Sequence, residues 1–173
     1  SVENTQYLWN DTTTFYQKFF NYYAFDDGTA ENGYGIVGLG TENAMVSMQF
    51  DSYIEDTLRG VQFYFNNLAK SSQTKYFKIH VWDDNNGKPG NIIYTLENQV
   101  VPKNNQLNKF VLFLFDEEII VRNKFYIGWQ KQNSPDMLNV GYDVNRNNKN
   151  KLFYNFTNQW KQSEFDGTVM IRP

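Results

Sequence analysis

The chain has 173 residues, an aromatic content of 18% and a net charge of −3 at pH 7, with a pI near 5.2. This length suits a single domain over 1–173, and the acidic balance, without a dense block of Lys and Arg, argues against nucleic acid as a partner. The lack of cysteine excludes disulfides and thiol chemistry, and the longest apolar run, 110–115, is far shorter than the roughly 20 residues that membrane insertion needs.

Short aromatic and β-branched runs, punctuated by Asn, Asp and Gly, predict strands along the whole chain. In the first half the expected strands cover 7–19, 21–25, 44–50 and 58–65. In the second half they cover 108–115, 119–121, 124–131, 138–144, 152–156, 160–162 and 168–172. No long segment has the 3.6-residue period of a helix. The pattern predicts an all-β fold, a two-sheet antiparallel β-sandwich with jelly-roll-like topology.

Two of these strands carry a further expectation about burial. The run 108–115 is apolar on both faces, which is typical of a central strand covered above and below. In the run 124–131, alternation places Trp129 on the buried side.

The most regular element is a hairpin whose arms are 75–82 and 91–96. Alternation places Phe77, Ile79 and Val81 on its buried side and Tyr76, Lys78, His80 and Trp82 on its outer side. The chain must turn at 83–90, because Asn, Asp and Gly tolerate left-handed backbone and proline cannot donate to a strand ladder.

The outer side of this hairpin is a candidate recognition surface. Tyr76 and Trp82 would offer flat apolar platforms, and His80, Asn85 and Asn86 could orient a polar partner such as a glycan or a cell-surface protein. The alternative is that these rings pack beneath a loop or belong to the core. Truncation of Trp82 would distinguish the two, because a core tryptophan costs about 3–5 kcal/mol of stability when removed.

Oxygen ligands for a metal ion are concentrated in the loop 26–35. Asp26, Asp27 and Glu31 could supply carboxylates to calcium, the hard cation that oxygen ligands favour. The alternative is ordinary turn chemistry, in which Asp carboxylates accept backbone N–H groups. Asp83-x-Asn85-x-Gly87 has the oxygen spacing of a calcium loop, but its twelfth position is Tyr94 where an EF-hand requires Glu.

Three segments resemble a β-sandwich accessory module of large secreted or surface proteins of Bacteroidetes that carry a C-terminal secretion-system sorting domain. They are Tyr23 to Glu31 with Gly33-Tyr34-Gly35, then Val81 to Gly90, and then Val169 to Pro173. The resemblance implies a secreted or cell-surface location, a binding or adhesion role and neighbouring domains in the same chain. The start at Ser1, with no apolar signal segment, likewise indicates a domain taken from a larger protein.

Catalysis has weaker support in the sequence. His80 is the single histidine and no Gly-x-Ser-x-Gly motif is present, so a serine triad has no framework. Paired carboxylates could hydrolyse a glycoside, with candidates Asp26, Asp27, Glu31, Asp83, Asp84, Glu117 and Glu118. The sequence therefore favours a non-catalytic binding module, with a glycan-active hydrolase or a purely structural spacer as alternatives.

Overall fold

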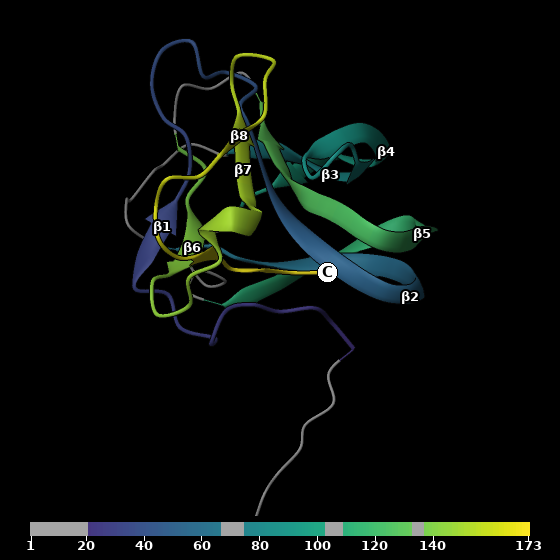
Figure 1. Ribbon diagram of the computed structural model, residues 1–173. Coiled ribbons are helices and arrows are strands. Elements are labelled where there is room, and N and C mark those ends of the chain that lie inside the picture. Colours follow the sequence, from purple (N-terminus) through teal and green to yellow (C-terminus); the bar gives the residue numbers. More distant parts are fainter. Residues whose placement is uncertain (1–20, 67–74, 103–108, 133–136) are drawn as a thin grey trace, which may run out of the picture.

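The computed structural model describes residues 21–66, 75–102, 109–132 and 137–173 (Figure 1). Its elements are β1 (Asn32–Tyr34), β2 (Met45–Tyr64), β3 (Tyr76–Asp84), β4 (Pro89–Val100), β5 (Phe110–Lys131), β6 (Val140–Asp143), the 3-10 helix η3 (Lys149–Lys151), β7 (Leu152–Asn155), β8 (Lys161–Gln162), β9 (Thr168–Val169) and β10 (Ile171–Arg172). Within the described residues there is no helix with the length and apolar character that a membrane crossing requires.

The strands form two antiparallel sheets that pack on each other. The large sheet has the order β4-β3-β5-β2-β7-β8, with β10 beside the far half of β2, and the small sheet has the order β1-β6-β9. Figure 1 shows the small sheet on one side of the molecule and the long strands β2 and β5 extending to the other. The predicted all-β, jelly-roll-like sandwich is confirmed.

The two longest strands, β2 and β5, are the centre of the large sheet. They pair from Met45 with Gln130 to Tyr64 with Phe110, with two register shifts between. The sequence predicted separate strands at 44–50 and 58–65, and again at 108–115, 119–121 and 124–131, which is wrong. The polar residues that suggested turns lie at bulges within β2 and β5, and a bulge bends a strand without ending it.

Other strand predictions also need correction. The segment 21–25 is not a strand, although the Tyr23 amide donates to the Pro173 carbonyl. The run 168–172 is divided between the sheets, with β9 in the small sheet and β10 in the large one. The expected strand at 7–19 lies outside the described residues. The predicted hairpin of β3 and β4 is confirmed. The strands β7 and β8, which lie within the predicted strands at 152–156 and 160–162, pair with each other.

The main core lies between the two sheets and is rich in aromatic rings. Phe63 contacts Phe65, Phe77 and Trp129 at ring-centroid distances of 5.9–6.0 Å. Trp129 is buried as predicted. The expectation that the start of β5 is covered on both faces is wrong, because Leu112 and Leu114 are 55% and 66% exposed.

Candidate functional site

The predicted recognition surface on β3 is largely covered. Trp82 is only 1% exposed and forms a small cluster with Tyr126 and Phe153 on the side of the large sheet that faces away from the main core. Trp160, in the connection between β7 and β8, packs over Trp82. Alternation placed Trp82 on the outer side correctly, but the inference that it is exposed is wrong, because a segment distant in sequence covers it.

His80 is also buried, with 4% of its surface exposed. Its ring nitrogens lie 2.8 Å from the Thr95 hydroxyl oxygen and 3.1 Å from Gln130 Oε1. Burial lowers the pKa of His80 below its ordinary value. The expectation that His80 is available to an external partner is therefore wrong.

The exposed members of the predicted surface do not form one patch. Tyr76 is 51% exposed at the start of β3, whereas Asn85 and Asn86 are exposed in the turn after its end. A strand of this length places them roughly 30 Å apart. Asn85 exchanges backbone hydrogen bonds with Lys88, and Asn86 has a positive φ of 54°, so both asparagines have a structural role in the turn.

An acidic cluster joins the loop after residue 25 to the turn after β6. One carboxylate oxygen each from Asp27, Glu31 and Asp143 lies within 4.8 Å of the others. Asp143 is fully buried and accepts the Asp27 amide at 2.7 Å, and Glu31 accepts the Val144 amide at 3.1 Å. Hydrogen bonds from Thr29 hold the pKa of Asp27 below its usual value. The backbone hydrogen bonds therefore hold the three carboxylates close together.

Asp26 does not belong to this cluster. Its side chain is 0% exposed and forms a two-oxygen ion pair with the Arg172 guanidinium, in which Nε lies 3.1 Å from Oδ2. The Arg172 guanidinium also lies over the ring of Phe110, 3.8 Å from its centroid. The sequence predicted Asp26 as a metal ligand alongside Asp27 and Glu31, whereas the structure places both of its oxygens on Arg172 and outside the acidic cluster.

The acidic residues at the β3–β4 turn have partners within the hairpin. Asp83 accepts the Asn91 amide at 2.6 Å, and Asp84 accepts the Gly87 amide at 3.1 Å. These contacts are the turn chemistry that the sequence offered as the alternative to a second calcium loop.

A groove of about 510 Å³ lies between the segment 21–23, the far half of β2, the start of β5 and the C-terminal strand. Its lining combines the rings of Tyr22 and Tyr23 with the polar side chains of Asp56 and Gln62 and the exposed leucines of β5. The Tyr23 hydroxyl donates to Asp56 Oδ2 at 2.5 Å, which fixes the tyrosine at the groove. A volume of this size is in the range of small-ligand sites.

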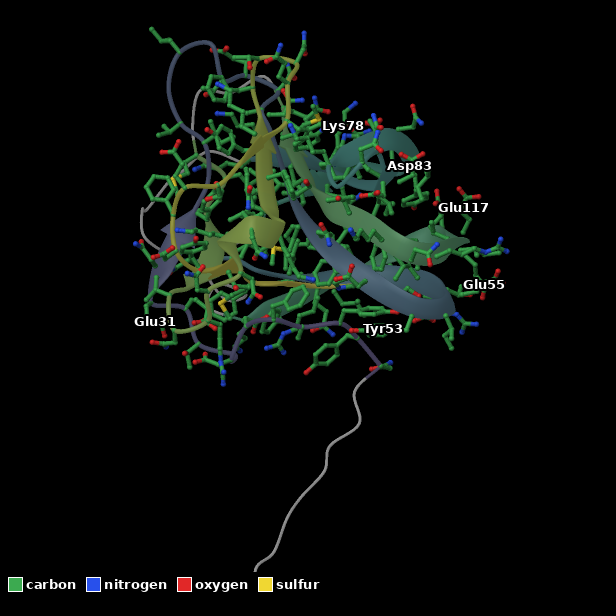
Figure 2. All side chains as sticks on the ribbon, in the orientation of Figure 1. Glu31, Tyr53, Glu55, Lys78, Asp83 and Glu117 are labelled. Atoms are coloured by element: carbon green, nitrogen blue, oxygen red, sulfur yellow. The ribbon has the colours of Figure 1, made fainter. Side chains whose placement is uncertain are left out.

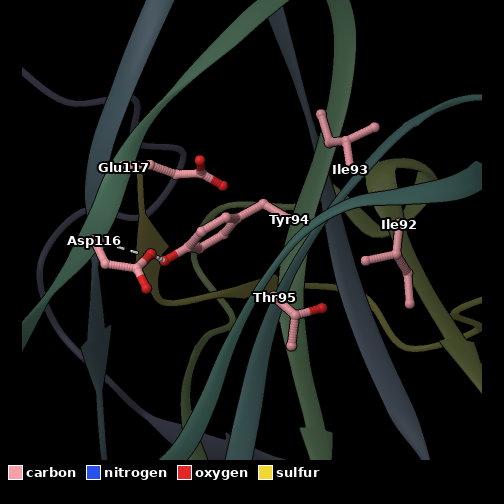
Figure 3. Close-up of a pocket in the computed structure, with 6 residues that line it drawn as sticks. All are labelled: Ile92, Ile93, Tyr94, Thr95, Asp116 and Glu117. Atoms are coloured by element: carbon pink, nitrogen blue, oxygen red, sulfur yellow. Dashed lines mark hydrogen bonds between the residues drawn. The ribbon is translucent and has the colours of Figure 1, made fainter.

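A second, shallower depression of about 580 Å³ separates β4 from β5 (Figure 3). The Tyr94 hydroxyl crosses it, donates to Asp116 Oδ1 at 2.5 Å and accepts the Asp116 amide at 3.2 Å. Glu117 is the next residue of β5, and its side chain lines the same depression. Asp116 is held by its hydrogen bonds with the Tyr94 hydroxyl.

Figure 2 places Glu31 and Glu117 at opposite sides of the molecule. The acidic cluster and the depression between β4 and β5 are therefore separate sites. The sequence did not identify Asp143 or the groove residues. Asp143 begins an Asn-rich turn, a weak local signal, whereas the groove is formed by segments from both ends of the chain.

No family model and no curated protein matches the sequence. Among solved structures, the chain is similar to one that contains the cysteine protease and lectin-like domains of Cwp84, a surface layer associated protein of Clostridium difficile. The TM-score is 0.53 at 13% sequence identity, over 75% of this chain and 31% of that one. This likeness shows the fold alone, and the chain spans about a third of that protein's solved length.

Proposed function

We propose that this chain is a non-catalytic carbohydrate-binding module of a larger secreted or cell-surface protein. The observation that carries the proposal is the groove of about 510 Å³, which places tyrosine rings beside a carboxylate and an amide. The lectin-like description of the structural neighbour supports the same ligand class, and its surface-layer association supports a location outside the cell. The cysteine protease part of that description finds no counterpart, since this chain has no cysteine.

The chemistry of the groove suits a sugar. A pyranose ring has an apolar face that stacks on aromatic rings and a rim of hydroxyl groups that need donors and acceptors. Tyr22 and Tyr23 are half-buried and can offer ring surface, while Gln62 and Asp56 line the same groove. Leu112 and Leu114 add an apolar wall. Few ligand atoms would be enclosed, so we expect weak, micromolar-to-millimolar binding that depends on several contacts.

The groove offers less to a hydrolase. Glycoside hydrolysis with paired acids needs two carboxyl groups roughly 5–9.5 Å apart across one bond. Asp56 is the one Asp or Glu side chain among the described residues that line the groove. We therefore propose that the chain binds a carbohydrate without hydrolysing it. A structural spacer is the alternative if the binding experiment detects no ligand.

Calcium is the ion that we propose for the acidic cluster. Asp27, Glu31 and Asp143 offer carboxylate oxygens close together, and hard oxygen ligands select calcium over softer metals. The ion would neutralise three neighbouring acids and hold the loop after residue 25 against the turn after β6. The role of the ion there would be structural, apart from carbohydrate binding in the groove.

A glycan array followed by titration calorimetry of the hits tests the main proposal. We expect at least one hit, and we expect Tyr22→Ala and Gln62→Ala to weaken it about tenfold or more, which corresponds to about 1.4 kcal/mol. Tyr76→Ala is the matched control, because it removes an exposed tyrosine at a distance from the groove. Loss of binding in Tyr76→Ala alone would move the site to the β3–β4 hairpin, and an empty array would favour a spacer.

On the basis of the sequence resemblance, we also propose that this chain is an accessory module of a Bacteroidetes surface protein. The sequences that flank Ser1 and Pro173 in the parent gene test it directly. A sorting domain downstream would support it, and a parent protein without export signals would refute it.

A further inference from the structure

Among the residues that the structure describes, no strand pairs with the edge of the first half of β5 that faces away from β2. Residues 110–114 pair with β2 at 60–64, and in the described part of the chain β3 pairs with β5 over 126–131, beyond this half. At Asp116 the amide points away from β2, and a tyrosine hydroxyl from β4 accepts it where a neighbouring strand would otherwise do so. The two halves of β5 also differ in the burial of their core-facing side chains. Phe125 and Ile127 in the second half are fully buried, whereas Phe113 and Phe115 in the first half are half-buried.

This edge lacks the features that usually prevent strand addition. Natural proteins protect open edges with charges, proline or bulges. The six residues 110–115 contain no charge and no proline, and their pairing with β2 is regular over 110–114, before the register shift between Leu114 and Ile119. Leu112 and Leu114, on the outer face, are more than half exposed. An uncharged apolar strand with a free edge is a site for pairing with another strand.

Charges at the two ends of the run identify the partner. Lys109 precedes it and Glu117 follows it, and both are exposed. When two copies of this strand pair antiparallel around a twofold axis between Phe113 and its symmetry mate, residues whose numbers sum to 226 lie opposite each other. Lys109 of each copy then lies at the same end of the strand pair as Glu117 of the other. Leu112 faces Leu114, so each exposed leucine gains an apolar neighbour.

We propose that the open edge of β5 pairs with the same edge of a second copy of this chain, which joins the two large sheets into one continuous antiparallel sheet. Opposite charges directly across a strand pair stabilise it and like charges destabilise it. The register that places Lys109 and Glu117 at the same end of the strand pair is thereby selected over shifted alternatives. The interface is isologous, so it closes at two copies and does not extend into a fibre.

A charge exchange tests both the dimer and its register. Sedimentation equilibrium of the 173-residue chain should show a reversible monomer–dimer equilibrium. Glu117→Lys should weaken dimerisation about tenfold, because it replaces two exposed ion pairs with two like-charge contacts. The double variant Lys109→Glu with Glu117→Lys should restore the wild-type constant. Neither residue lines the carbohydrate groove, so the outcome is independent of glycan binding.

Leu112→Lys places a charge on the open edge itself and should give a monomer with an unchanged circular dichroism spectrum. Leu39→Lys, at an exposed loop position, is the matched control and should leave dimerisation unchanged. A monomer at all concentrations, a double variant that stays as weak as Glu117→Lys, or growth into open-ended aggregates would each overturn the proposal.

Discussion

Trp160 packs edge-on against Trp82, with ring centroids 5.3 Å apart and planes at 85°. Trp82 lies on the outer face of β3 and Trp160 in the connection between β7 and β8. Aromatic pairs favour this edge-to-face geometry, because the positive ring edge meets the negative ring face. Because of this contact the outward-facing ring of Trp82 is buried, and the β7–β8 hairpin is joined to β3.

Removal of the Trp82 side chain should therefore destabilise the protein strongly. We expect Trp82→Ala to lower the free energy of unfolding by about 3–5 kcal/mol, measured by urea denaturation. Trp160→Ala should cost less, since Trp160 is only half-buried. If Trp82→Ala unfolded at the same urea concentration as wild type, the packed role assigned to this ring would be wrong.

The buried ion pair of Asp26 with Arg172 should also matter for stability. Asp26→Asn leaves the largely covered guanidinium without its counter-charge, and we expect a loss of about 3 kcal/mol. Glu55→Gln is the matched control, because Glu55 and Arg122 form an exposed pair that is worth about 1 kcal/mol or less. Thermal and urea unfolding of both variants gives the comparison, and equal losses would contradict it.

His80 should give the protein a pH dependence of a definite sign. Its pKa in the folded state is lowered by burial, so the unfolded state binds a proton more readily. The stability contribution of the neutral ring is full above the unfolded pKa of 6.5 and is lost as the pH falls toward the lower folded value. Urea unfolding of wild type and His80→Gln at a series of pH values should show the difference narrowing in this window. A difference that is constant with pH would refute the assignment.

The calcium proposal predicts a thermal shift. An ion that binds only the folded state raises its stability by mass action, so millimolar calcium should raise the melting temperature and a chelator should reverse the rise. Asp143→Asn should abolish the shift. Asp83→Asn should retain it, because Asp83 bonds within the β3–β4 turn. A melting temperature indifferent to both calcium and chelator would exclude the ion.

Local patterns in the sequence determined the fold class and much of the strand content. The alternation of Phe77, Ile79 and Val81 with polar neighbours predicted the hairpin of β3 and β4, and the structure confirms it. Alternation also predicted the burial of Trp129. These features depend on residues next to one another in the chain, and the period of a strand can be recognised from such residues alone.

Only the tertiary structure decided which of these residues are accessible and which come together. Trp82 is covered by a ring far along the chain, and Asp143 joins Asp27 across 116 positions. Strand alternation assigns a side chain to a face, but it carries no information about what covers that face. For the same reason the sequence suggested a metal site near Asp27 but did not predict the surroundings of Asp26 or Asp143. Long-range contacts place Asp26 in an ion pair with Arg172 and bring Asp143 into the acidic cluster.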